Sequence, residues 1–149
     1  MLREKIDELI AQATHNGDSS LGILRLIKAE FLKYNASKEA VKKPIDDIIE
    51  IQILNKMVKQ RKEAELMYVN GGRQDLADKE HQEAEFIEAY LPVPVTEEEI
   101  NAEVNQIFFD GVMPVKKNMG LIIKKVKEKY PTADGKLVST IVSKKLDMA

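Results

Sequence analysis

The stretch between Pro44 and Gly71 constrains the fold more than any other part of the chain. No glycine or proline interrupts it, so it can continue as one α-helix. A helix of about 25 residues that begins at Pro44 would extend roughly 37 Å. A second apolar helical pattern, from about Arg73 to Tyr90, follows after a loop so short that the two helices must lie antiparallel. The sequence therefore predicts a long helical hairpin.

Two amphipathic helices are predicted before this hairpin. Apolar residues recur at three- and four-residue steps over about residues 2–16 and again over 21–34. Gly17 is expected to end the first helix, and the side-chain oxygens of residues 18–20 are expected to cap the second. The connector over residues 35–43 is expected to be a loop.

A proline pair in the sequence YLPVPV ends the hairpin pattern and predicts a domain boundary. Thr96 and Glu99 then have the spacing of a capping box, and three short amphipathic helices follow. We therefore predict an all-α protein with a four-helix N-terminal domain over 1–92 and a small three-helix domain over 96–149. The residues expected to face the second core are Ile100, Val104, Ile107, Phe108, Met119, Ile122, Ile123, Val126, Leu137, Val138, Ile141 and Val142.

Charge is distributed unevenly along the chain. Residues 1–110 hold 14 Lys plus Arg against 22 acids, a balance of −8, whereas residues 111–149 hold 9 Lys against 3 acids, a balance of +6. Such an asymmetry favours a polyanion or an acidic partner near the C-terminal end. The alternative is a lysine-rich surface that is simply solvated.

The sequence shows few signs of catalytic chemistry. It has no Cys, no glycine-rich phosphate loop and no GxSxG turn, and neither His15 nor His81 lies in an HExxH motif. Acid pairs such as Asp46 with Glu50 are expected to be solvated charge on a polar helix face. We expect no metal site and no cofactor, and a binding or accessory module rather than a self-contained enzyme.

No apolar run approaches the roughly 20 residues that a membrane span needs. The first ten residues, MLREKIDELI, carry acids where a signal peptide would be apolar. We therefore expect a cytoplasmic protein without a membrane partner.

The combination of KQRK at 59–62, GGRQDL at 71–76 and YLP at 90–92, followed by MG at 119–120 and ADGKLVSTIVSKKL at 133–146, resembles the YqeY family. The domain of this family is also found at the tail of the B subunit of the bacterial glutamyl/aspartyl-tRNA amidotransferase. The residues that carry the motif are Lys59, Gln60, Arg61, Lys62, Gly72, Arg73, Asp75, Leu76, Tyr90, Leu91, Pro92, Gly120, Asp134 and Gly135.

The resemblance implies an all-α fold with a four-helix N-terminal part and a three-helix C-terminal part. It also implies a link to carbon-nitrogen ligase activity with glutamine as the amide donor, in which the tail domain contacts tRNA and other subunits catalyse. The family usually follows the MG pair with a lysine, whereas this chain has Leu121.

The leading hypothesis is an accessory module that binds tRNA through its phosphates, by shape rather than by base sequence. The alternative is a helical protein-protein interaction adaptor without nucleic-acid binding, and its partners would be amidotransferase subunits or another protein. The lysines predicted to meet RNA are Lys116, Lys117, Lys124, Lys125, Lys136, Lys144 and Lys145.

The hairpin loop raises a separate question. Gly71 and Gly72 can take the positive φ needed to end the long helix. Arg73 has two interpretations: it pairs with Asp75 or Glu63 and fixes the loop, or it presents its guanidinium to a partner.

Overall fold

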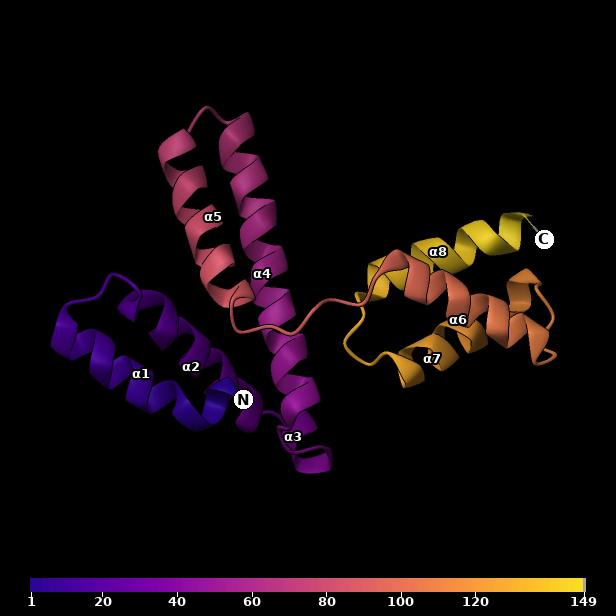
Figure 1. Ribbon diagram of the computed structural model, residues 1–149, viewed down its shortest axis with the longest axis horizontal. Coiled ribbons are helices and arrows are strands. Elements are labelled where there is room, and N and C mark those ends of the chain that lie inside the picture. The colour runs from indigo at the N-terminus through magenta and orange to yellow at the C-terminus, as the bar shows by residue number, and fades with distance from the viewer. Residues whose placement is uncertain (149) are drawn as a thin grey trace. The chain divides into compact units, whose positions relative to one another are not determined.

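The computed structural model describes residues 1–148, and Figure 1 shows a chain built from helices and loops. No strand occurs in this described part, which confirms the predicted all-α class. The chain divides into two compact units, Met1–Pro92 and Val93–Ala149. The helices are α1 (Leu2–Asn16), α2 (Leu21–Asn35), α3 (Lys38–Lys42), α4 (Asp47–Asn70), α5 (Gln74–Glu88), α6 (Glu97–Phe109), the 3₁₀ helix η1 (Lys116–Asn118), α7 (Met119–Lys129) and α8 (Gly135–Met148).

The N-terminal unit is organised around the predicted hairpin of α4 and α5. Ile27 of α2, Leu54 of α4 and Ile87 of α5 are fully buried and form the centre of its core. The buried residues of α4 end at Val58, in the half of the helix near α1 and α2. The other half packs on α5 and extends away from α1 and α2 (Figure 1).

The start of the long helix differs from the prediction. It begins at Asp47 rather than at Pro44, because Asp46 is extended and its carboxylate accepts a hydrogen bond from the backbone N–H of Ile49 at 2.8 Å. An aspartate in this position satisfies one of the free donors at the helix N-terminus, so it fixes the first residue. The connector predicted as a loop also contains the short helix α3.

The turns at the helix ends follow the sequence only in part. Gly17 has φ +62° and ends α1 as predicted. In the hairpin loop Gly72 has φ +75° and Gly71 has φ −86°, so of the two glycines it is Gly72 that takes the positive φ. At the start of α2 the carboxylate of Asp18 accepts from the N–H of Ser20, while Ser20 makes no side-chain cap. The side-chain capping predicted for that helix is therefore wrong.

Glu50 contradicts the expectation that it lies on a solvated face with Asp46, because its side chain is completely buried. Its carboxylate accepts hydrogen bonds from the backbone N–H groups of Leu2 at 3.1 Å and Arg3 at 2.8 Å. The Arg3 guanidinium adds a contact to Glu50 and donates to Asp47 at 2.7 Å, and this second bond raises the pKa of Arg3. A carboxylate from α4 therefore caps the N-terminus of α1, where free N–H groups favour an anion.

The C-terminal unit contains α6, η1, α7 and α8. The predicted capping box is confirmed: Glu99 N–H donates to the Thr96 hydroxyl at 3.1 Å, and Thr96 N–H donates to the Glu99 carboxylate at 2.9 Å. Each of the three α-helices contributes apolar residues to one shared core. Its fully buried members are Ile100, Val104, Ile122, Val126, Val138 and Val142.

Candidate nucleic-acid interface

The positive charge predicted for residues 111–149 does not extend over the whole C-terminal unit. The unit that starts at residue 93 holds nine lysines and eight acids, a net charge of +1, and the N-terminal unit holds 14 Lys plus Arg and 17 acids, a net charge of −3. The split at residue 110 had separated the acidic helix α6 from the helices on which it packs. The C-terminal unit thus combines one acidic helix with a basic pair, α7 and α8.

Lys124 and Lys125 are exposed on α7 but point in different directions. Successive residues turn by about 100° around a helix axis, so with Ile122 and Val126 in the core, Lys124 faces away from it. Lys125 turns toward α6, where it lines an open pocket with a volume of about 400 Å³. The pocket is lined by Glu103, Ile107, Asp110, Val112, Lys125, Glu128 and Lys129.

The three predicted lysines of α8 also do not form one cluster. Lys136 and Lys145 are nine positions apart, so they leave the helix on opposite sides, about 180° apart. The ammonium group of Lys145 donates to the side-chain oxygen of Asn105 on α6 at 2.9 Å. Lys144 is exposed, and its side chain leaves α8 in a direction between those of Lys136 and Lys145.

The 3₁₀ helix η1 supplies the remaining two lysines, Lys116 and Lys117. Lys116 lies 3.5 Å from the carboxylate of Asp147, a contact that brings η1 next to the C-terminal end of α8. Lys116, Lys117, Lys144 and Lys145 therefore share one end of the unit. Lys136 lies at the other end of α8.

Most of these predicted lysines lack an intramolecular counter-ion. Five of them form no ion pair with any residue in the described part of the chain; we call them the unpaired lysine set. Two lysines outside the prediction have local roles: Lys129 pairs with Glu103 at 2.6 Å, which raises its pKa, and Lys127 donates to the Ala133 carbonyl. The unpaired lysine set consists of Lys117, Lys124, Lys125, Lys136 and Lys144.

The family-motif cations of the hairpin serve a different purpose. Arg61, which is largely buried, donates to Glu83 of α5 at 3.2 Å and to the backbone carbonyl of Met57 at 3.1 Å. Lys62 lies 2.9 Å from Glu88, also on α5. Arg61 and Lys62 of the KQRK segment therefore stabilise the packing of α4 on α5.

Arg73 makes the pairing with Asp75 that the sequence offered as one alternative. Its Nε and Nη2 atoms each lie 3.1 Å from a carboxylate oxygen of Asp75. These bonds raise the pKa of Arg73 and lower the pKa of Asp75. Both side chains are exposed, so a contact of Arg73 with a partner stays a prediction.

The other motif residues differ in burial and in their contacts. Leu76, Tyr90 and Leu91 are half-buried, and the last two pack against the N-terminal core. The carboxylate of Asp134 accepts from the N–H of Lys136 at 3.2 Å at the start of α8. The exposed members are Lys59, Gln60, Gly72, Pro92, Gly120, Asp134 and Gly135.

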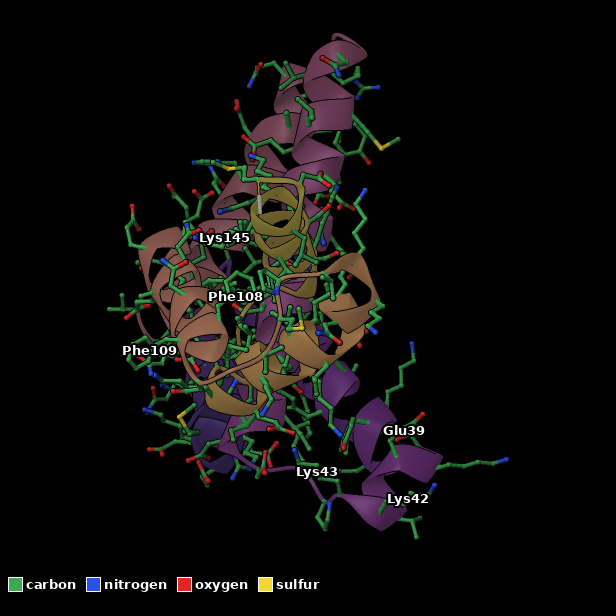
Figure 2. The ribbon with its side chains drawn as sticks, turned by 90° about the vertical axis from the view of Figure 1, so that its right-hand side faces the viewer. Glu39, Lys42, Lys43, Phe108, Phe109 and Lys145 are labelled. Carbon is green, nitrogen blue, oxygen red and sulfur yellow. The ribbon has the colours of Figure 1, made fainter. Side chains whose placement is uncertain are left out.

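Sequence reasoning missed an exposed aromatic side chain in the C-terminal unit. Phe108 is half-buried against the C-terminal core, whereas Phe109 is 86% exposed at the end of α6. No local signal separates the two rings, because consecutive residues of a helix can pack in one core, as Ile141 and Val142 do in this unit. Figure 2 labels both rings together with Lys145.

Two properties of the described residues bear on other kinds of site. No group of three or more His, Cys, Asp or Glu residues in this part of the chain could hold a metal ion. None of its helices combines the length and the apolar character needed to cross a membrane.

Comparison with known proteins places these features in a family. A family model described as "Yqey-like protein" matches residues 3–146. The chain is also similar to a protein named "Altered inheritance of mitochondria protein 41, mitochondrial" from Kluyveromyces lactis, with 33% identity over 92 residues. The match covers 60% of this chain and 46% of that protein, so the chain matches less than half the length of this relative.

Proposed function

This chain belongs to the YqeY family, and on that premise we propose that it is an accessory RNA-binding module related to tRNA-dependent amide transfer. In this proposal the chain holds tRNA through phosphates while an amidotransferase partner performs the carbon-nitrogen ligase chemistry. The chain contributes no catalysis alone. Its one completely buried carboxylate among the described residues, Glu50, is engaged by the N-terminus of α1.

The unpaired lysine set is the observation that carries the proposal. An ammonium group without a local counter-ion can neutralise a phosphate and release its bound cations, which favours binding. Lys117, Lys124 and Lys144 are exposed on η1, α7 and α8. Because these lysines spread over three elements, they fit an extended phosphate backbone better than a single small anion, and they supply affinity without base sequence.

Salt dependence of tRNA binding tests this proposal. Anisotropy of a fluorescent tRNA transcript is measured with the full chain between about 50 and 200 mM salt, and each phosphate contact steepens the slope of log K against log salt by about 0.7–0.9. The double variant K124E/K125E is expected to make the slope shallower by about two contacts and to weaken binding by about tenfold or more.

The control uses a second pair of adjacent lysines, Lys42 and Lys43, at the end of α3 in the N-terminal unit (Figure 2). K42E/K43E makes the same change in net charge, so equal losses in both double variants would mean that net charge alone sets the affinity. Absence of tRNA binding by the native chain at low salt would overturn the proposal.

The distal half of the hairpin favours the second candidate function, a protein-protein adaptor. Leu66, Met67 and Val69 are 62%, 73% and 46% exposed near the end of α4. Several exposed large apolar residues on one part of a helix favour a protein interaction site over a purely solvated surface. If the adaptor role is correct, purified amidotransferase subunits bind the native chain but not L66D/M67D, and neither protein binds tRNA at low salt.

A cytoplasmic location remains a prediction. The Kluyveromyces lactis relative is named as a mitochondrial protein. We propose that the chain is located in the same compartment as tRNA-dependent amide transfer. Cell fractionation, with an antibody against the native chain, measures which compartment contains it.

A further inference from the structure

Phe109 is an exposed aromatic residue in a well-defined position. It occupies the last turn of α6, and its side chain is 86% exposed. The turn beyond it is fixed by Gly111 at φ +108° and by a hydrogen bond of 2.9 Å from the Asn118 side chain to the Met113 carbonyl. The ring is therefore presented by an ordered helix end and an ordered turn.

Asn105 and Lys145 give this ring polar neighbours. Asn105 precedes Phe109 by four positions, so the two side chains are neighbours along the surface of α6. Lys145 of α8 donates to the Asn105 oxygen at 2.9 Å, which places an ammonium group beside the same surface. Figure 2 shows Lys145 and Phe109 on the side of the C-terminal unit that faces the viewer.

The charges at this end of the unit are mainly positive. Lys116, Lys117 and Lys144 lie on η1 and on the last turns of α8, and Lys116 is paired with Asp147. Asp110, the residue after Phe109, accepts a hydrogen bond from Gln106 at 2.9 Å. An anionic ligand therefore meets more lysines than acids here.

We propose that Phe109 is a stacking site for one unpaired base of RNA, with Lys145 contacting an adjacent phosphate. An exposed ring offers a face for any base, and a nearby cation offers a contact for the backbone; together these are the two elements of single-strand recognition. A purely apolar protein partner would form no favourable contacts with the lysines at this end of the unit. The inference rests on the proposed RNA-binding function and names the part of the RNA that the unit holds.

The absence of tryptophan from the chain provides a direct test. In the F109W variant of this chain the new indole is the only tryptophan side chain. Its fluorescence is expected to be quenched by stacking on a base when a single-stranded oligoadenylate is added. L66W, on the hairpin of the other unit, is the control for an exposed tryptophan, and its fluorescence is expected to stay constant. Binding without quenching of F109W would overturn the inference.

Affinity measurements separate stacking from simple apolar contact. F109A is expected to weaken oligoadenylate binding by about tenfold, while F109Y retains affinity. F109L keeps an apolar side chain without the aromatic face and is expected to lose affinity as F109A does; retention by F109L would contradict stacking. K145Q is expected to reduce the salt slope by about one contact, or about 0.7.

The outcomes distinguish this inference from the proposed function. If the native chain binds tRNA with a steep salt dependence but F109A changes oligoadenylate affinity by less than about twofold, the stacking site is wrong and the RNA-binding function stands. If the native chain binds neither RNA at low salt, both proposals fail together. Circular dichroism of F109A is expected to match the native chain, because the ring is exposed.

Discussion

The two antiparallel helix pairs, α4 with α5 and α7 with α8, use charge in opposite ways. Residues 47–88 hold six Lys plus Arg and ten acids, whereas residues 119–148 hold seven lysines and three acids. In the first pair the acids lie across the helix interface, so Arg61 and Lys62 find partners on α5. In the second pair acids are scarce, and most of the lysines keep no counter-ion in the described chain.

The difference between the two pairs is that a lysine or arginine can either have an acidic partner on the facing helix or remain without one. Where acids are available on the facing helix, a cation becomes part of the fold, and its contribution is to stability. Where they are not, the cation is left to solvent, and under the proposed function it is available to bind a phosphate. Variants that remove charge should therefore affect stability in the N-terminal unit and RNA affinity in the C-terminal unit.

The largest effect is expected for Glu50→Ala, in the N-terminal unit. The change removes a completely buried carboxylate and leaves the N–H groups of Leu2 and Arg3 without their acceptor, which should cost about 3–5 kcal/mol. Hydrogen exchange is expected to show lost protection in α1 and unchanged protection in α7 and α8. E63A, at an exposed site on the same helix, is the control and should change stability by less than about 0.5 kcal/mol.

A smaller effect is expected for Arg61→Ala. Its side chain is 13% exposed and bonds to both Glu83 and the Met57 carbonyl, so its loss should cost about 2 kcal/mol in urea unfolding. The neighbouring variant K62A removes a pair whose side chains are 61% and 43% exposed, and should cost no more than about 1 kcal/mol. Equal costs for the two variants would show that burial does not set the value of these pairs.

His81 is expected to give the hairpin a modest dependence on pH. Its ring nitrogens lie 3.1 Å from Glu65 and 2.9 Å from Glu85, and the hydrogen bond with Glu65 is the first cause of its raised pKa. Because the folded pKa lies above the unfolded value, the stabilisation is complete below about pH 6.5 and is lost as the pH rises through the folded pKa. Urea unfolding should show a larger loss for H81Q at pH 5.5 than at pH 8.5; no difference would contradict the pairing.

The smallest effect on stability is expected for the double variant K124Q/K144Q, in the C-terminal unit. Both side chains are exposed and belong to the unpaired lysine set, so the free energy of unfolding should change by less than about 0.5 kcal/mol per site. The same variant should weaken tRNA binding and flatten its salt dependence. A clear loss of stability would mean that these lysines also belong to the fold.

Local signals in the sequence predicted much of the fold. The capping box of Thr96 and Glu99, the glycine cap at Gly17 and the hairpin turn depend on residues a few positions apart, so the sequence shows them directly. The prediction failed where two local signals competed. Pro44 favours a helix start, but Asp46 supplies a cap two residues later and determines the first residue of α4.

By itself the sequence determined the all-α class, the helical hairpin and the family, because periodicity, caps and motifs are local properties of the chain. Only the tertiary structure decided what the charged side chains do. Glu50 is buried because it meets the start of α1, 48 positions away in the sequence, and Lys145 meets Asn105, 40 positions away. Whether a charge is buried, paired or available depends on which helices pack together, and helical periodicity does not specify the neighbour.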